Sequence, residues 1–288
     1  MKVHLVDGTY ELYRQHFGQA TRHSEPPPLA ATIGVLSSTL QLIADGATHI
    51  GVASDHVIES FRNDLYEGYK TSEGMEPVIM HQIPLVEEAL RTMGITVWPM
   101  EEYEADDALG SAARVAAADS RVQQVVMLTP DKDLGQCVAG THVVQFDRRN
   151  NIIIDEAAVI TKFGVEPASI ADYLGLVGDT SDGFPGLPGW GAKSAATVLA
   201  KYKTIEAIPN DETTWDVQVR GAAKLAATLR DNRELAALFK KIATIITTVE
   251  VGVVDDWFWK GPTPQFQELC DELGSPQLAK RAAMLAPK

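Results

Sequence analysis

The sequence predicts an α/β fold in which a mostly parallel central sheet is followed by a helical C-terminal region. Through the first half of the chain, short β-branched runs alternate with longer helical patterns, which is typical of βαβ units. From Glu156 onward the pattern becomes helical. The chain has 288 residues, of which 45% are hydrophobic, so it is long enough to bury one substantial core.

Four strands separated by helices are expected in the first half. In chain order the segments are KVHLV, a helix over about 28–44, HIGVAS, a helix over about 77–93, ITVWP, a helix over about 103–118, and VVMLT. The residues from Pro26 to Pro28 are expected in a loop. HVVQFD and NNIIID flank Arg148 to Asn150 and predict a hairpin or meander at one edge of the sheet. We therefore expect an α/β core over residues 1–165 and a helical region over residues 166–288.

The interval from Val57 to Pro77 lacks the pattern of a core-packing helix. It carries few aliphatic residues, mixed charges and three interleaved aromatics. We interpret it as a mobile segment that faces a partner. Lys70 beside Tyr69 is the strongest candidate for a functional cation there, and Tyr66 and Tyr69 are candidates to stack on unpaired bases.

Composition restricts the class of protein. The two cysteines, Cys137 and Cys270, match no metal or redox spacing, so both are expected to be reduced and structural. The apolar stretch at the N-terminus ends at Asp7, too early for a signal peptide or a membrane span, so we expect a cytoplasmic protein. The formal charge of −14 argues against a nonspecific nucleic-acid binder, unless bound cations neutralise clustered carboxylates.

Acidic residues follow the ends of the predicted strands, where a parallel sheet places its ligands. Taken alone, each is more simply a turn former or a helix cap. Together they would repel one another strongly unless cations bridged them, and oxygen-only ligand sets suit Mg²⁺ or Mn²⁺. The sequence therefore predicts a divalent-metal site, at which two ions would assist a phosphoryl displacement. Its candidate ligands are Asp7, Asp55, Glu104, Asp106, Asp107, Asp131, Asp133, Asp179 and Asp182.

Some of these acids are expected to share a face of their local element. Glu104 and Asp107 are three residues apart on a helix. Asp179 and Asp182 would share a face if their turn is helical, and Asp131 and Asp133 would do so if their segment is extended.

Two other motifs contain some of the same acids, but each lacks residues that it needs. The DGT at Asp7 is like the loop of haloacid-dehalogenase-type phosphatases, but Leu5 stands where their nucleophile would be. The stretch from Asp131 begins like a calcium loop, but Gly135 stands at its fifth position and His142 at its twelfth, so it is not an EF-hand.

The run GFPGLPGWGAKSAATVLAKY predicts a phosphate-binding turn. Gly189 and Gly191 precede a helix whose first turn carries Lys193. Glycines let a phosphate approach the backbone, and the helix N-terminus offers unpaired N–H groups. Because a helix precedes the turn as well, a helix-hairpin-helix over about 167–203 is expected, which grips a duplex without reading bases. The simpler alternative is a tight turn with a helix cap.

With these residues in place, the chain resembles the 5′ nuclease family of flap endonucleases, phage 5′ exonucleases and the N-terminal domain of bacterial DNA polymerase I. The resemblance runs over about residues 3–250. The motifs that carry it are LVDGTYELYR, FRNDLYEGYK, EYEADDALG, TPDKDL, YLGLVGDTSDGFPGLPGWGAKSA and KIATI.

This resemblance implies a PIN-like nuclease core, a helical arch at about 57–80 and a helix-hairpin-helix that holds duplex DNA, often with a K⁺ ion. It implies one metal cluster formed by the acids from Asp7 to Asp107 and a second formed by those from Asp131 to Asp182. It also implies that Arg62, Tyr69 and Lys70 lie at the base of the arch, with Lys70 on the scissile phosphate. The DNA-binding residues that it implies are Tyr69, Gly189, Gly191, Lys193 and Ser194.

The chain departs from the family at positions that are not metal ligands. Thr71, Ser72 and Glu73 follow Lys70 where the family continues to an arginine, so a second arch cation is absent. Ser54, Pro130 and Gly183–Phe184 replace the usual Phe, Gly and Asn-Ile.

A monomer that cuts DNA with 5′ flaps, nicks, gaps or 5′ overhangs during repair or replication is therefore expected, with no membrane partner. The alternative is a scaffold of the same fold that binds branched DNA without cutting it, although such a relative should have lost acids.

Overall fold

The computed structural model describes residues 1–20 and 29–287, and it divides into two compact units. Unit 1 comprises residues 1–58, 72–129 and 247–288, and unit 2 comprises residues 59–71 and 130–246. The two units therefore alternate along the chain. The loop predicted at Pro26 to Pro28 lies outside the described residues.

Unit 1 is built on four parallel strands in the order β3-β2-β1-β4. They are β1 (Lys2–Asp7), β2 (His49–Asp55), β3 (Thr96–Met100) and β4 (Gln124–Leu128). The middle strands are buried along almost their whole length, as is typical of a parallel sheet covered on both faces. The predicted α/β fold with parallel strands is confirmed.

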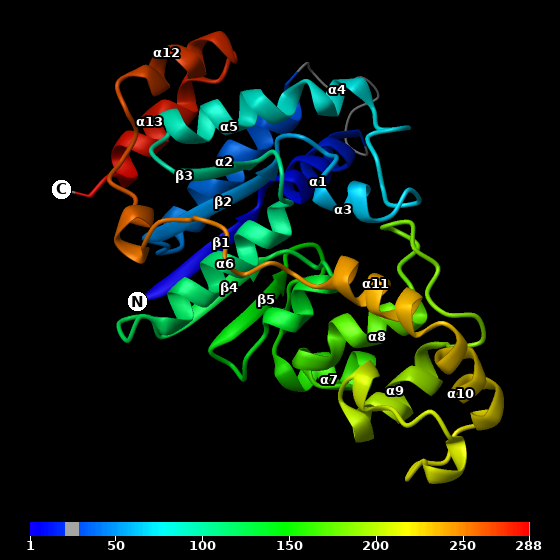
Figure 1. Cartoon of the computed structure of the whole chain (residues 1–288). Coiled ribbons are helices and arrows are strands. Elements are labelled where there is room, and N and C mark those ends of the chain that lie inside the picture. The colour runs from blue at the N-terminus through cyan, green and yellow to red at the C-terminus, as the bar shows by residue number, and fades with distance from the viewer. Residues whose placement is uncertain (21–28, 288) are drawn as a thin grey trace. The chain divides into compact units, whose positions relative to one another are not determined.

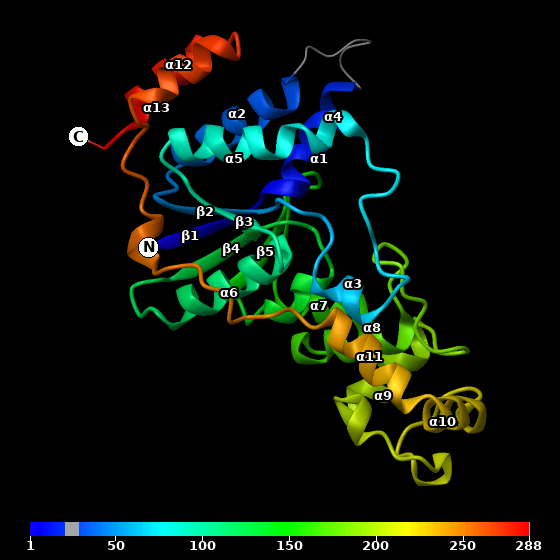
Figure 2. The same cartoon turned by 45° about the horizontal axis from the view of Figure 1, so that its top comes forward.

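Helices cover both faces of this sheet (Figures 1 and 2). One face carries α2 (Ala30–Ala44) and α5 (Gln82–Thr92), and the other carries α6 (Ala105–Ala118). The remaining helices of unit 1 are α1 (Gly8–Ala20), α4 (Pro77–Met80), the short 3-10 helix η5 (Val254–Trp257), α12 (Gln265–Glu272) and α13 (Pro276–Leu285). Helix α1, which directly follows β1, was not predicted.

Close packing against β2 shows why the core needs particular residues. A Cβ atom at Gly51 would lie 2.1 Å from the ring of Trp98, so only glycine leaves room for this indole. The Trp98 ring meets Trp257 edge to face at 5.4 Å, and its Nε1 donates a hydrogen bond to the carbonyl of Val251 at 3.1 Å. The C-terminal segment is thereby fixed to the sheet of unit 1.

Unit 2 is mainly helical and includes one antiparallel strand pair, β5 (Val143–Asp147) with β6 (Ile152–Ile154), at the predicted hairpin. Its α-helices are α3 (Phe61–Leu65), α7 (Glu156–Phe163), α8 (Ile170–Val177), α9 (Ala192–Tyr202), α10 (Ala222–Asp231) and α11 (Arg233–Ala243). Its 3-10 helices are η1 (Asp133–Cys137), η2 (Pro167–Ser169), η3 (Ile205–Ala207) and η4 (Glu212–Thr214).

Helices α8 and α11 form the centre of unit 2. Phe184, just after α8, stacks on Phe239 of α11 with ring centroids 5.5 Å apart. The buried Asp172 of α8 forms an ion pair with Lys240 of α11, with 2.8 Å between Oδ1 and Nζ. These contacts anchor the loop that follows α8, which carries two of the predicted metal ligands.

In the segment predicted as an arch, residues 57–80, the helical parts are α3 in unit 2 and α4 in unit 1, and residues 66–76 are not helical. Both cysteines are free thiols. Among the described helices, none combines the length and the apolar character that a membrane crossing needs.

Candidate metal and DNA site

The first set of carboxylates lies where strands of unit 1 end. Asp7 is the last residue of β1 and Asp55 is the last residue of β2. The two strands are parallel neighbours with Asp7 opposite Ala53, so both acids lie at the same edge of the sheet. Glu104, Asp106 and Asp107 come just after β3, at the start of α6. These five acids, which we call the first set, thus follow the ends of strands β1, β2 and β3.

Hydrogen bonds orient Asp7 and Asp55. The Oδ1 of Asp7 accepts from the backbone N–H of Tyr10 at 2.8 Å, and its Oδ2 accepts from the hydroxyl of Thr129 at 3.0 Å. The Oδ1 of Asp55 accepts from the backbone N–H of Ala105 at 2.8 Å, so it also binds the N-terminus of α6. Sequence reasoning missed Thr129, although its place at the end of the predicted strand VVMLT was a usable signal.

Glu104 and Asp107 cap helix α6. Asp107 is fully buried, and its Oδ2 accepts from the backbone N–H of Glu104 at 3.0 Å. Glu104 is the N-cap residue and is 4% exposed, whereas Asp106 is half-buried. The first set therefore has a structural role in addition to any role as ligands.

The second set, Asp131, Asp133, Asp179 and Asp182, lies in unit 2. In Asp133, Asp179 and Asp182, one carboxylate oxygen of each lies within 4.8 Å of the others, which is close enough to share a metal ion. The Oδ1 of Asp131 accepts from the backbone N–H of Asp133 at 2.9 Å. Among the described residues, no three carboxylates of the first set reach the spacing of this trio.

The backbone that brings the second set together is neither α-helical nor a regular strand. Asp179 and Phe184 exchange two backbone hydrogen bonds, at 2.8 and 3.1 Å, which close a tight loop around Asp182. Asp133 begins the 3-10 helix η1, two residues after Asp131. The helical turn and the extended segment considered from the sequence are thus replaced by a closed loop and a 3-10 turn.

Asp133 shows that the second set fits a cation. It is 6% exposed, and its Oδ1 finds no hydrogen-bond partner among the residues that the structure describes. Burial raises the pKa of Asp133 well above its ordinary value, and the neighbouring charges of Asp131, Asp182 and Asp179 raise it further. An unsatisfied buried oxygen among carboxylates suits a hard divalent cation with oxygen ligands.

Two lysines contact the second set. The Nζ of Lys70 lies 3.0 Å from Oδ1 of Asp182, and its backbone N–H donates to the Asp182 carbonyl at 3.0 Å. The Nζ of Lys132 lies 2.5 Å from Oδ1 of Asp179. Lys132 was not predicted as a site residue, although it stands between Asp131 and Asp133 in the sequence.

Arg62 and Tyr69, the other residues expected at the base of the arch, are buried, and Tyr66, a candidate to stack on bases, is half-buried. Arg62 is 2% exposed, and its guanidinium donates to the carbonyls of Ile242 at 2.8 Å and Thr244 at 3.1 Å. Tyr69 is 4% exposed, and Tyr66 packs edge to face on Phe239 at 5.4 Å. The structure thus places these three side chains in packing contacts within unit 2.

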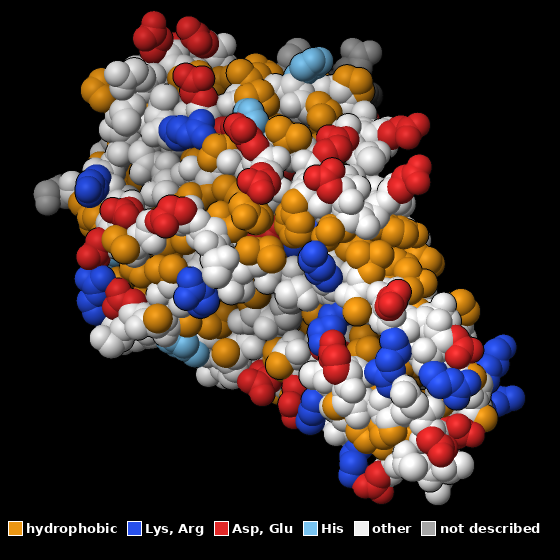
Figure 3. Space-filling view, in the orientation of Figure 1, with side chains coloured by type: hydrophobic (Ala, Val, Ile, Leu, Met, Phe, Trp, Pro, Cys, Tyr) orange, Lys and Arg blue, Asp and Glu red, His pale blue; other side chains and the backbone are white. Residues whose placement is uncertain are grey.

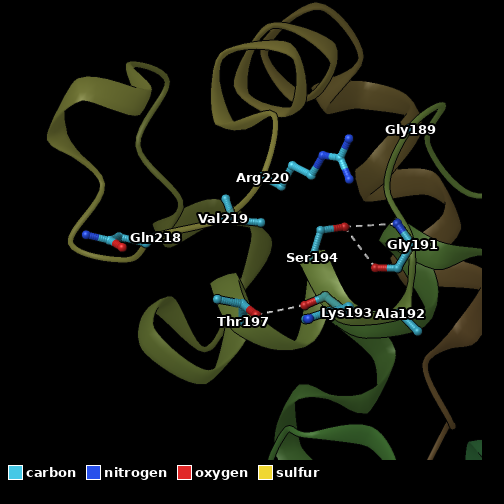
Figure 4. Close-up of a pocket in the computed structure, with 9 residues that line it drawn as sticks. All are labelled: Gly189, Gly191, Ala192, Lys193, Ser194, Thr197, Gln218, Val219 and Arg220. Atoms are coloured by element: carbon cyan, nitrogen blue, oxygen red, sulfur yellow. Dashed lines mark hydrogen bonds between the residues drawn. The ribbon is translucent and has the colours of Figure 1, made fainter.

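The predicted glycine turn lies between α8 and α9. Gly189 has a φ of +84°, which favours glycine, and Gly191 is the N-cap residue of α9. The hydroxyl of Ser194 accepts from the backbone N–H of Gly191 at 3.0 Å and donates to its carbonyl at 2.9 Å. Lys193 is exposed in the first turn of α9. These residues line one side of a cavity (Figure 4).

Comparison with known families gives two adjacent matches. Residues 2–164 match the "5'-3' exonuclease, N-terminal resolvase-like domain", and residues 165–265 match the "5'-3' exonuclease, C-terminal SAM fold".

Two curated relatives illustrate the range of similar proteins. DNA polymerase I of Pseudomonas aeruginosa is 34% identical over 92% of this chain and 29% of its own length. The 5'-3' exonuclease of Buchnera aphidicola from Baizongia pistaciae is 31% identical over 86% of this chain and 83% of its own length. The chain thus spans less than a third of the length of this polymerase, but most of the length of the exonuclease.

Solved structures share the fold. The T5 D15 protein co-crystallised with metal ions has a TM-score of 0.70 at 14% identity, covering 99% of this chain and 98% of that chain. The catalytic core of Rad2 in complex with a DNA substrate has a TM-score of 0.63 at 14% identity, covering 99% of this chain and 90% of that chain.

Proposed function

Because the chain belongs to the 5′–3′ exonuclease family, we propose that it is a structure-specific 5′ nuclease that hydrolyses DNA phosphodiesters. The proposed activities are 5′→3′ exonuclease and 5′-flap endonuclease, in DNA repair or replication. The observation that carries the proposal is the trio of Asp133, Asp179 and Asp182, whose oxygens lie within 4.8 Å of one another and include a buried oxygen of Asp133 with no partner among the described residues.

The proposed chemistry is two-metal-ion hydrolysis with Mg²⁺ or Mn²⁺, using the first and second sets as ligands. When bound, the ions would supply Lewis-acid stabilisation and lower the pKa of a bound water. Asp7 and Asp55 enter this role already oriented, because N–H and hydroxyl donors fix their carboxylates. Mg²⁺ keeps several waters, so some of the nine acids would act through water.

Lys70 is the proposed cation on the scissile phosphate. Its ammonium group already lies beside Asp182, so a phosphate bound at the second set would be within its reach. Arg62 is proposed to act indirectly, since its guanidinium ties α3 to two carbonyls at the C-terminal end of α11 and so supports the segment that carries Lys70.

The proposed substrates are DNA duplexes with 5′ flaps, nicks, gaps or 5′ overhangs, bound by a monomer in the cytoplasm near the nucleoid. The turn at Gly189 and Gly191, with Lys193 and Ser194, would hold the duplex backbone, with a K⁺ ion as a further proposed ligand. Tyr69 would contribute through the position that it gives Lys70, whose Nζ lies 5.4 Å from the centre of its ring.

A 5′-labelled flap duplex tests the proposal. Cleavage should appear with Mg²⁺ or Mn²⁺, disappear with EDTA, and leave a 5′-phosphate and a 3′-hydroxyl. Asp182→Asn should abolish cleavage while DNA binding in EDTA is kept, because the carboxylate is needed for the metal and not for the duplex. Asp231→Asn, which alters an exposed acid paired with Arg230, is the matched control and should cleave like the wild type. Tight binding of branched DNA with no product under any metal would instead favour the non-cutting scaffold.

A further inference from the structure

The cavity beside the glycine turn has a second wall that the sequence argument did not include. The cavity measures about 650 Å³. One wall is the Gly189–Gly191 turn with the first turn of α9, and the other is the segment Gln218–Arg220, which precedes α10. Figure 4 shows Arg220 extending from this segment toward the turn.

Buried tryptophans hold the two walls together. The indole Nε1 of Trp190, inside the glycine turn, donates to the carbonyl of Leu225 in α10 at 3.2 Å. The Trp190 ring also lies 6.2 Å from the ring of Trp215, which leads into the second wall. The position of Arg220 is therefore coupled to the glycine turn through packed side chains.

The second wall is also tied to the far end of α9. The backbone N–H of Asp216 donates to the hydroxyl of Tyr202 at 2.8 Å, and the Asp216 carboxylate pairs with Lys201. The segment that carries Arg220 is thus anchored on both sides.

No carboxylate in the described part of the chain pairs with the two cations at this cavity. Elsewhere in unit 2, Lys201, Lys203 and Lys240 each pair with a carboxylate. Lys193 and Arg220 are exposed, and neither has a carboxylate partner in the part of the chain that the structure describes. Figure 3 shows Lys and Arg side chains at the surface around α9 and α10, alongside acidic ones. Two unpaired cations from separate segments therefore face one cavity, in a chain whose net charge is −14.

We propose that Arg220 is a second DNA-positioning residue, and that Gln218–Arg220 forms the opposing wall of a site for the sugar-phosphate backbone of the duplex. The inference rests on the proposed function and deepens it. A planar guanidinium can bind two phosphate oxygens at once, which a lysine cannot. Glycines and a hydroxyl on the facing wall leave room for a backbone without offering groups that select a base. The site is therefore expected to fix the register of the duplex and not to read its sequence.

The test compares three variants at one exposed arginine with a matched control. Arg220→Ala, Arg220→Lys and Arg220→Gln are measured beside Arg230→Ala, which alters an exposed arginine of α10 that pairs with Asp231. Fluorescence anisotropy with a labelled 5′-flap duplex, in EDTA and over a series of KCl concentrations, gives the affinity and its salt dependence. Arg220→Ala should weaken binding by about tenfold and reduce the slope of log Kd against log salt by about one.

The conservative variant distinguishes contact from packing. Arg220→Lys should restore the salt slope and only part of the affinity, whereas Arg220→Gln should behave like the alanine variant. Lys193→Ala should reduce the slope in the same way, while Arg230→Ala should match the wild type. With Mn²⁺ present, Arg220→Ala should raise KM by about the same factor as Kd and leave kcat within about twofold, as expected for uniform binding.

Equal affinity and salt slope in Arg220→Ala and Arg230→Ala would overturn the assignment of Arg220. Loss of binding in Arg220→Ala together with a lowered melting temperature, not restored by Arg220→Lys, would also overturn it, since that pattern belongs to a structural residue. If the wild type binds the duplex with this salt dependence but cuts nothing with any metal, the proposed nuclease function fails while the role of Arg220 in binding stands.

Discussion

The two carboxylate sets differ in how the folded protein satisfies them. In the first set, Asp7, Asp55 and Asp107 accept hydrogen bonds from backbone N–H groups and from a hydroxyl. In the second set, Asp131 and Asp179 also accept from backbone N–H groups, but Asp133 keeps a buried oxygen without a partner in the described residues, and Asp179 and Asp182 are paired with lysines. The first set therefore stabilises the fold through the same oxygens that it offers as ligands. The second set is a cluster of charge whose balance depends on cations.

The largest expected effect is on catalysis by the second set. Asp133→Asn should reduce single-turnover cleavage by about 10³-fold, because it removes a charge needed at the metals. The free energy of unfolding in EDTA should stay the same or rise by about 1 kcal/mol, because the neutral amide is not repelled by the neighbouring carboxylates and costs less to bury than a charge. Cleavage of a flap duplex and thermal melting measure the two quantities. If this variant cleaves normally, Asp133 is not needed at the metals. If it loses several kcal/mol of stability, the second set supports the fold as the first does.

The second set also depends on a close approach of two backbone segments. Gly183 has a φ of +85°, and a Cβ atom there would lie 2.2 Å from the carbonyl oxygen of Gly68, just before Lys70. Gly183→Ala should therefore lower the stability of the protein by about 3 kcal/mol through strain and displacement of the Lys70 segment. Chemical denaturation gives the value. Gly189→Ala is the control, because its φ is similar, +84°, but nothing lies within 4 Å of the added Cβ. Equal losses in both variants would assign the whole effect to backbone conformation.

Acid should act on the strand that leads to the first set. His4 lies in β1, and burial, with the charge of Lys2, lowers its pKa from 6.5 to about 4. The unfolded chain therefore binds a proton at His4 between these values while the folded chain does not, so stability is lost as the pH falls from about 6.5 toward 4. At pH 5 the loss from this group is about 2 kcal/mol. His4→Gln should remove that part of the pH dependence, measured as the difference between the two denaturation profiles. Parallel profiles would show that His4 titrates normally.

The sequence predicts those site positions that depend on a local pattern of residues. The ends of β1 and β2 could be placed because their buried runs stop at Asp7 and Asp55, and the topology of a parallel sheet then puts both at one edge. Helix α1 was missed, because its polar sequence follows the strand without a separating turn.

The rest of the site depends on contacts between distant segments. Asp179 and Asp182 meet Asp133 through a loop closed by backbone hydrogen bonds, which neither a helical nor an extended period encodes. Arg220 lies about thirty residues beyond the glycine turn and is brought to it by tertiary contacts, among them those of Trp190. Such placements follow from tertiary packing, so a motif that predicts the ligands does not predict the residues that orient them.

The smallest expected effect concerns the stability that Asp107 of the first set gives to the fold. Asp107→Ala removes the acceptor for the backbone N–H of Glu104 at the start of α6, and so should cost about 1 kcal/mol of stability in EDTA, in addition to any loss of cleavage. Asp107→Asn keeps an acceptor oxygen and should recover most of that stability without recovering the charge. Asp133→Ala, measured in the same buffer, should cost less than Asp107→Ala, because no hydrogen bond to the removed Oδ1 is lost among the described residues. If Asp133→Ala lowers the free energy of unfolding as much as Asp107→Ala does, the second set supports the fold as the first does. The unsatisfied oxygen of Asp133 would then no longer indicate a cation site.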